Sequence, residues 1–237
     1  MKMITFASLK GGAGKTTALM TACGSLVSKG LRVGLLEADE NAPLHQWRKY
    51  ALKKGTWNES CEIEDAVDLQ AFEAAYERLE ARDMDIVLAD TQGGGSEFNL
   101  TILASSDMIV IPTALTRLDL DSALDTYALV AEMLETSDTP DMPVGILVTQ
   151  IPTGRLTSAQ SFCLETIQGL PSFDCKLPAR NAFADLKSVG MLHLYEVALS
   201  KIPSKRIAAT HISTALKDAD TFANDLMQVL GDEHAHS

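Results

Sequence analysis

The sequence predicts an α/β fold: a three-layer, doubly wound and mostly parallel sheet with helices on both faces. Short apolar runs alternate with longer segments of helical period along the chain, as expected for parallel strands joined by crossover helices. The runs are almost continuously apolar, which is typical of strands covered on both faces. A glycine-rich loop between the first strand and the first helix places a ligand site at the carboxyl edge of this sheet.

Six strands and five helices are expected in this order. The strands cover Met3–Ser8, Val33–Ala38, Ile86–Ala89, Met108–Ile111 and Val144–Val148, with a weaker one near Phe173–Leu177. The helices cover 15–29, 64–81, 119–135, 157–168 and 207–230, and Thr157 is the expected N-cap of the fourth. Since no repeat or Pro/Gly/Ser-rich linker interrupts the pattern, we expect a single domain over 1–230, followed by a flexible tail, 231–237.

The composition excludes several classes of protein. The chain has 237 residues, of which 46% are hydrophobic and 22% charged, so it can bury a core and wholesale disorder is not expected. No apolar run approaches the roughly 20 residues of a membrane span, and glycines interrupt the N-terminal segment before a signal-peptide core. A cytoplasmic protein without a membrane span is therefore expected, with association to the nucleoid or a cell pole left open. The four cysteines show no CxxC spacing, which favours buried thiols over disulfides or zinc ligands.

The net charge is strongly negative but unevenly distributed. With 20 Lys+Arg and 32 Asp+Glu it is −12, which excludes a wholly basic nucleic-acid coat. Residues 1–55 hold nine basic and three acidic side chains (+6), residues 56–141 three and twenty (−17), and residues 142–237 eight and nine (−1). A local basic surface therefore remains compatible with the sequence.

The strongest motif follows the first expected strand and opens the first helix. It fits the phosphate-loop variant KGGxGKT[ST]. Glycines let backbone N–H groups turn toward phosphates, the helix N-terminus adds its dipole, Lys15 reaches the β- and γ-phosphates, and the Thr16 hydroxyl ligates Mg²⁺. The motif predicts nucleotide binding by the loop residues Gly11, Gly12, Ala13, Gly14, Lys15, Thr16 and Thr17.

Acidic residues end two of the later strands. Asp90 follows the apolar run Ile86–Ala89, and a carboxylate in this position is expected to hold Mg²⁺ through water. The glycines after it suit a loop that responds to the γ-phosphate. Glu37 and Asp39 end the second strand, at the edge where ligands of open α/β sheets bind, and this site is favoured over the alternative of an exposed acidic turn.

Together these motifs resemble the deviant Walker A P-loop ATPases of the ParA/MinD group, over roughly residues 1–200. Further stretches, among them ADEN, ADT-x-GG-x-SE, GRLT and GMLHL, look most similar to the VirC-type ATPases encoded on plant-tumour plasmids. That subgroup is implicated in DNA processing before type IV secretion.

The resemblance implies roles for individual residues. Lys10 matches the signature lysine that reaches across a dimer to the partner's ATP; without the resemblance it would be a solvated loop residue. Lys15 and Asp39 match the other catalytic positions, Asp39 as the acid that positions the attacking water. Glu37 is one methylene longer than the family's first acid, so its place in the magnesium water shell stays open. The purine base is expected beside the loop that begins at Pro178.

The resemblance also implies DNA binding without strong sequence preference, by ATP-bound dimers. Residues 176–206 carry an excess of four positive charges. The expected contacts are Arg180, Lys187, Lys201, Lys205 and Arg206, with ordinary solvated helix faces as the open alternative. Residues 48–54 hold four cations and no acid, but a solvated face is favoured there. Trp47 and Trp57 flank this stretch, and core packing is favoured over a stacking platform.

The implied function is a slow, partner-stimulated ATPase that uses ATP and Mg²⁺ and acts as a dimerising switch in plasmid or T-DNA processing, positioning or partition. Its expected partners are a second copy of the chain, DNA, and a ParB-like or relaxase/transfer-complex protein. A metabolic ATP-dependent enzyme on the same fold is one alternative, for which no substrate motif is found. A MinD-like membrane-cycling regulator is another, but the acidic residues of 207–230 argue against binding to an anionic membrane.

Overall fold

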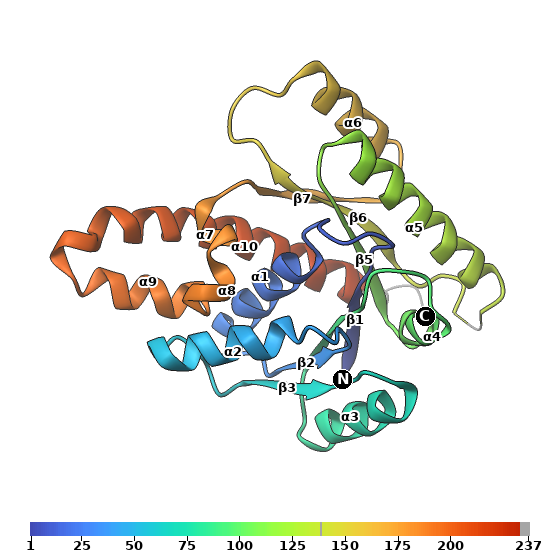
Figure 1. Cartoon of the computed structure of the whole chain (residues 1–237), viewed down its shortest axis with the longest axis horizontal. Helices are drawn as coiled ribbons and strands as arrows, with labels where there is room; N and C mark the ends of the chain where they lie inside the picture. The colour runs from blue at the N-terminus through green and yellow to red at the C-terminus, as the bar shows by residue number, and fades with distance from the viewer. Residues whose placement is uncertain (138, 233–237) are drawn as a thin grey trace.

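The computed structural model describes residues 1–137 and 139–232, and within them seven strands form one sheet (Figure 1). The strands are β1 Lys2–Phe6, β2 Val33–Glu37, β3 Cys61–Asp65, β4 Ile86–Asp90, β5 Met108–Thr113, β6 Val144–Ile151 and β7 Ser172–Pro178. Every pairing is parallel, in the order β3-β2-β4-β1-β5-β6-β7, which confirms the predicted fold class. Strands β4 and β1 are neighbours in the sheet, but the connection from β1 runs to β2 on one side and the connection from β4 runs to β5 on the other. Ligands of open α/β sheets bind where the connections diverge in this way, so a ligand crevice is expected beside β1.

Helices cover both faces of the sheet. They are α1 Lys15–Ser28, α2 Pro43–Lys54, α3 Leu69–Ala81, α4 Glu97–Ala104, α5 Arg117–Glu135, α6 Ser158–Gln168, α7 Asn181–Ala184, α8 Leu186–Val189, α9 Leu192–Ser200 and α10 Arg206–Asp232. Successive side chains of a strand point to opposite faces, so Ile4 and Phe6 pack with α1 and α10 while Met3 packs with α3. Helices α1, α2 and α7–α10 therefore cover one face, and α3–α6 cover the other.

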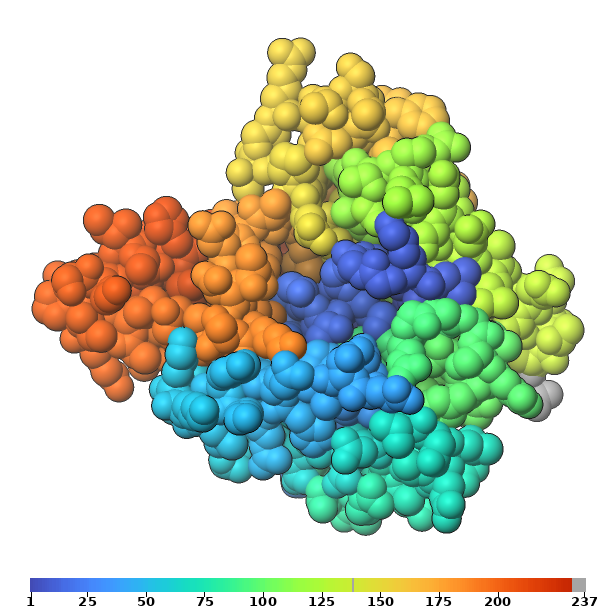
Figure 2. Space-filling model, viewed as in Figure 1, coloured from blue at the N-terminus to red at the C-terminus, as the bar shows by residue number. Residues whose placement is uncertain are grey.

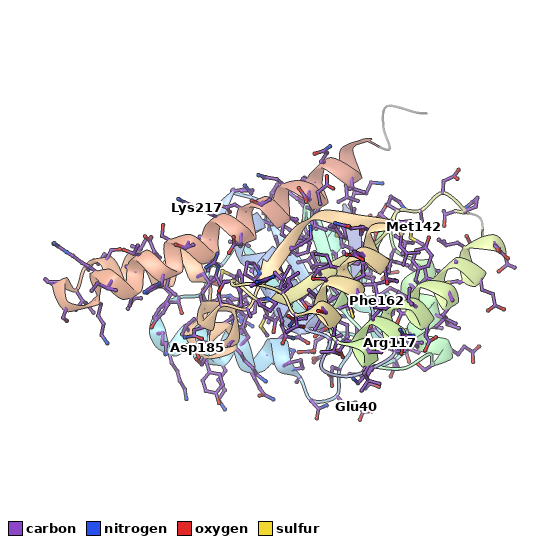
Figure 3. The ribbon with its side chains drawn as sticks, turned by 90° about the horizontal axis from the view of Figure 1, so that it is seen from above. Glu40, Arg117, Met142, Phe162, Asp185 and Lys217 are labelled. Carbon is purple, nitrogen blue, oxygen red and sulfur yellow. The ribbon has the colours of Figure 1, made fainter. Side chains whose placement is uncertain are left out.

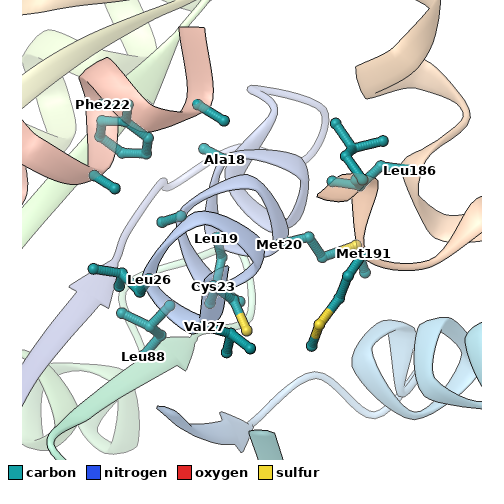
Figure 4. Close-up of a cluster of buried hydrophobic side chains, with 14 of the residues drawn as sticks. Ala18, Leu19, Met20, Cys23, Leu26, Val27, Leu88, Leu186, Met191 and Phe222 are labelled. Carbon is teal, nitrogen blue, oxygen red and sulfur yellow. The ribbon is translucent and has the colours of Figure 1, made fainter. Parts of the chain in front are cut away.

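Helix α1 is the central element of the first layer (Figure 4). Its Leu19 and Leu26 are fully buried, with Leu88 of β4 and Phe222 of α10 in the same cluster. Burial of each such leucine contributes about 1.5–3 kcal/mol. The start of α1, and with it the loop that follows β1, is consequently held against a rigid core.

The expected helix over 64–81 is wrong at its start, and strand β3 was not predicted. Cys61–Asp65 forms the edge strand beside β2, and α3 begins only at Leu69. In β3 apolar and acidic side chains alternate, which is the pattern of a strand with one solvated face. Asp68 then caps α3, since its Oδ1 accepts a hydrogen bond from the Ala71 amide at 2.8 Å.

The other expected helices agree with the structure to within two residues. Thr157 caps α6 and forms a capping box with Gln160, as predicted for its N-terminus. Helix α10 extends to Asp232, and the rest of the expected tail, 233–237, lies outside the described residues. Helices α2, α4, α7, α8 and α9 were not predicted, and most of them are too short to show a helical period.

The expectations for the tryptophans and the cysteines are also confirmed. Trp47 and Trp57 are buried and meet edge to face, with ring centroids 5.1 Å apart, so they belong to the core. The four cysteines are buried. In the described part of the chain, no helix combines the length and the apolar character needed to cross a membrane.

Candidate nucleotide-binding site

The loop between β1 and α1 has the shape of a phosphate cradle. Gly12 and Gly14 have φ angles of 93° and 84°, in the left-handed region that favours glycine. A Cβ on Gly14 would lie 3.1 Å from the Thr149 hydroxyl, so the backbone there has little room for a side chain. No side chain caps the N-terminus of α1, which leaves its first amide N–H groups and its positive dipole end for an anion.

Two loop side chains converge on Asp90 at the end of β4. The Lys15 Nζ lies 2.9 Å from Asp90 Oδ1 and also donates to the Thr91 carbonyl, while Thr16 Oγ1 donates to Asp90 Oδ2 at 2.7 Å. Asp90 is fully buried and Lys15 nearly so. A hydroxyl beside a carboxylate is the hard oxygen chemistry that Mg²⁺ prefers. The structure thus brings together three of the predicted site residues.

Glu37 lies in the adjacent strand, at the position paired with Asp90, and is buried. Its Oε2 accepts hydrogen bonds from the amides of Leu44, at 2.6 Å, and His45, at 3.3 Å, so it caps α2. Its Oε1 has no hydrogen-bond partner among the described residues. Burial, and secondarily the nearby Asp90 charge, raise the pKa of Glu37 to about 7, although the Leu44 hydrogen bond opposes this. The capping role was not predicted, while the unpartnered oxygen fits a place in the water shell of a cation.

The raised pKa of Glu37 makes protein stability depend on pH. A buried carboxyl that stays protonated up to about pH 7 carries no penalty below pH 4.5, its unfolded pKa, and progressively destabilises the fold as pH rises through 7. We expect the free energy of unfolding of the wild type, relative to Glu37→Gln, to fall by about 2 kcal/mol between pH 5.5 and pH 8. The glutamine keeps an oxygen for the Leu44 amide. Urea unfolding at both pH values measures this difference, and a pH-independent gap between the two proteins would contradict it.

Asp39 lies in the turn between β2 and α2. Its Oδ1 accepts hydrogen bonds from the Asn41 amide N–H and the Asn41 Nδ2, both at 2.9 Å. Asn41 thus orients the Asp39 carboxylate, which is partly exposed. In the described residues, no hydrogen bond connects Asp39 to Lys15, Thr16 or Asp90.

Lys10 and Lys15 leave the loop toward different elements. The Lys10 Nζ lies 3.1 Å from Asp119 Oδ1, in the first turn of α5, and the Lys10 side chain is 40% exposed. Thr116 caps α5 and donates to the other Asp119 oxygen at 2.6 Å. Lys10 therefore makes its ion pair at the rim of the site. No role had been predicted for its partner, Asp119.

The loop after β4 packs directly against the phosphate cradle. A Cβ on Gly93 would lie 3.6 Å from the Gly11 nitrogen. The buried Asn99 of α4 holds this loop, since its Nδ2 donates to the carbonyls of Gln92 at 3.1 Å and Gly94 at 2.9 Å. A shift of the cradle would therefore displace the loop after β4 and, through Asn99, helix α4. Asn99 was missed because nothing in its local sequence marks it.

A cavity of about 360 Å³ adjoins the cradle. Gly14, Thr17, Thr149, Gln150, Pro178, Arg180, Asn181 and Phe183 are among its lining residues. Its size and mixed lining suit a small organic ligand. Pro178 thus lies beside the phosphate loop, where the purine base was expected. In Figure 2 the loop (blue) is exposed between the segment around 180–190 (orange) and the segment that follows β4 (green).

The five expected DNA contacts lie in three places. Arg180 forms an ion pair with Asp218 of α10 at the edge of the cavity. Lys187 is half-buried in α8, and the other three are exposed at the turn between α9 and α10, namely Lys201, Lys205 and Arg206.

Comparison with known proteins decides the family. The model of the VirC1 protein family matches residues 1–232. This chain belongs to the VirC1 family. Two VirC1 proteins are similar over nearly their whole length. That of Rhizobium rhizogenes is 44% identical, over 94% of this chain and 96% of that protein; that of Rhizobium radiobacter is 42% identical, over 97% and 99%.

The VirC1-family chain also resembles partition proteins. A ParA protein of Rhizobium radiobacter is 23% identical over 97% of this chain and 98% of that protein. A plasmid partition protein of Borrelia burgdorferi, solved with bound AMPPNP, is 17% identical, with a TM-score of 0.65 over 96% of this chain and 98% of that chain. The structural likeness shows a shared fold. The chain is thus a VirC1-family protein that is similar to ParA.

Proposed function

We propose that this VirC1-family chain is an ATP-dependent, dimerising switch ATPase of the ParA type, acting in plasmid or T-DNA processing, positioning or partition. The observation that carries the proposal is the convergence of Lys15 and Thr16 on the buried Asp90, beneath a loop whose glycines adopt left-handed conformations. A lysine, a hydroxyl and a carboxylate at a phosphate loop are the groups with which P-loop NTPases hold the phosphates and Mg²⁺.

The residues present fit ATP and Mg²⁺. Residues Gly11 to Thr17 would hold the phosphates, Thr16 and Asp90 would hold Mg²⁺, the latter through water, and Pro178 would lie against the base. The unpartnered Oε1 of Glu37 would accept a hydrogen bond from a magnesium-bound water. Bound MgATP supplies the phosphoryl group that is transferred and the charge that Lys15 neutralises.

In the proposed hydrolysis step, the protein positions groups and forms no covalent bond. The Asp39 carboxylate, oriented by Asn41, holds the attacking water, and Lys15 stabilises negative charge on the phosphates. Only one protein acid is proposed to orient the water, so turnover is expected to be slow until a partner completes the site. Candidate partners are a ParB-like protein or a relaxase and transfer complex.

Lys10 is proposed to act across the dimer. Its side chain already leaves the loop on a different path from that of Lys15, and it is bound to Asp119 by a partly exposed ion pair of the kind worth about 0–1 kcal/mol. Because this ion pair is weak, Lys10 can leave Asp119 and bind phosphate oxygens of a nucleotide held by a second copy of the chain. ATP would thereby join two subunits, and the paired subunits would bind DNA through Lys187, Lys201, Lys205 and Arg206.

Two variants test this proposal in one experiment. We expect Lys10→Ala to lose both ATP-dependent dimerisation and turnover, because its charge completes the partner's site. We expect Asp39→Ala to dimerise with ATP but to hydrolyse it at least about 100-fold more slowly, because the variant lacks only the carboxylate that orients the attacking water. Light scattering and phosphate release measure the two properties. A Lys10→Ala protein that dimerises and turns over normally would refute the role across the dimer.

A further inference from the structure

Two basic segments that are far apart in the sequence lie side by side in the fold. The C-terminal half of α2 contains Lys49, Lys53 and Lys54, and α9 leads into the turn with Lys201, Lys205 and Arg206. The Lys54 Nζ lies 5.9 Å from the centre of the Tyr195 ring of α9. The end of α2 is also fastened to α8, because the Thr56 hydroxyl donates to the Val189 carbonyl at 2.7 Å. Figure 1 shows α2 along the lower side of α8 and α9, and Figure 2 shows their surfaces in contact.

Within the described residues, the cations of this region form no ion pairs with acids. Among residues 1–137 and 139–232, no ion pair involves Lys49, Lys53, Lys54, Lys187, Lys201, Lys205 or Arg206. Lys29, Arg32, Arg155 and Lys217 also form no ion pair within the described residues, so this region is set apart by the clustering of its cations. The chain carries twelve more acids than bases, yet α2, α8 and the α9–α10 turn bring seven cations onto neighbouring elements. They leave a surface whose field attracts a polyanion.

The α2 part of this surface has the chemistry of a nucleic-acid contact. No acidic residue occurs in α2. Lys49 and Lys53 are one turn apart on the helix, as are Tyr50 and Lys54, so the four side chains form a continuous strip. Tyr50 is 44% exposed, and a tyrosine among lysines can pack against sugar and base edges. Since the cations are spread over α2, α8 and the α9–α10 turn, they match phosphates spaced along a duplex better than one point of membrane insertion.

We infer that these residues form one DNA-binding surface, the α2–α9 surface, made of Lys49, Tyr50, Lys53 and Lys54 of α2, Lys187 of α8, and Lys201, Lys205 and Arg206 at the α9–α10 turn. The inference rests on the DNA binding proposed above and extends it to α2. Its ligand is the sugar-phosphate backbone of duplex DNA. Arg180 is not part of the surface, since Asp218 already neutralises it.

The test is a salt titration of DNA binding by the ATP-bound protein. The variant Lys49→Ala/Lys53→Ala removes two exposed cations. Its control, Arg155→Ala/Lys217→Ala, removes two exposed cations outside the surface; Lys217 lies on the side of α10 turned away from Asp185 (Figure 3). Fluorescence anisotropy with a labelled duplex of arbitrary sequence gives Kd between 50 and about 300 mM NaCl. Thermal unfolding checks that both variants fold.

We expect the α2 variant to bind DNA about 10- to 60-fold more weakly near 0.1 M salt and to lower the slope of log K against log salt by about 2, while the control behaves as the wild type. If the wild type binds DNA only with ATP and the α2 variant equals it, the extension to α2 is overturned and the proposed function stands. If the wild type binds no DNA in any nucleotide state, both are overturned. If it instead binds vesicles of phosphatidylglycerol and phosphatidylcholine, and the α2 variant loses this, the surface is a membrane contact.

Discussion

Replacing Lys15 with alanine is expected to weaken ATP binding by at least about 100-fold and, independently, to destabilise the protein by about 3 kcal/mol. The first effect follows from the loss of the cation that reaches the phosphates. The second follows from the structure, because Lys15 is the ion-pair partner of Asp90, and Asp90 is fully buried. Without Lys15, the Thr16 hydroxyl is the remaining hydrogen-bond donor to this buried carboxylate among the described residues. Binding of a fluorescent ATP analogue and urea unfolding measure the two losses.

A second variant separates the two effects of Lys15. In Lys15→Ala/Asp90→Asn the buried position is neutral, so most of the lost stability should return while ATP binding stays weak. The matched single variant Asp90→Asn should lose less stability than Lys15→Ala, because the Lys15 side chain is not fully buried and still donates to the Thr91 carbonyl. Should Lys15→Ala be as stable as the wild type, the ion pair between Lys15 and Asp90 would contribute nothing to the fold.

Replacing Gly190 with alanine is expected to cost about 4 kcal/mol of stability and to lower Tm by about 10 °C. Gly190 has a φ of 86°, and a Cβ there would lie 2.1 Å from the Thr56 hydroxyl and 2.8 Å from the Ala51 Cβ. Thr56 cannot move aside, since it is fully buried and bonded to the Val189 carbonyl. The added methyl group would therefore push α8 away from the end of α2.

Gly30 provides the control for Gly190. Its φ of 91° is equally unfavourable for alanine, but no atom lies within 4 Å of the added Cβ. Gly30→Ala should therefore cost only the backbone strain, about 1–2 kcal/mol. Calorimetry on both variants gives the difference, and equal losses would show that the contact with Thr56 adds nothing.

Local sequence was sufficient wherever the chain itself fixes the geometry. The phosphate loop is contiguous, and its strand and helix are strongly patterned, so the placement of Lys15 and Thr16 in one site could be predicted without a structure. Asp90 could be placed because an acid at the end of a buried parallel strand must reach the same edge as the loop. The position of Pro178 could not be predicted from local sequence alone, because it lies beside Gly14 only once β6 and β7 have completed the sheet.

Residues that act through tertiary contacts were not predictable in the same way. Asn99, Asp119 and the Arg180–Asp218 pair each connect segments whose proximity no local pattern reveals. Glu37 was identified, but its capping of α2 depends on a helix that was itself not predicted. The two basic segments were judged separately, because only the packing of α2 against α8 and α9 makes them neighbours.

The edge strand β3 has a consequence for solubility. A strand at the rim of a sheet exposes unpaired backbone groups and can recruit strands of other molecules. Here Glu62 and Glu64 project from β3, and Arg78 and Arg82 of α3 hold them in a network of ion pairs. An incoming strand would have to desolvate these charges and displace the arginines. The acids of β3 and their ion pairs with α3 therefore protect the folded protein from edge-to-edge aggregation.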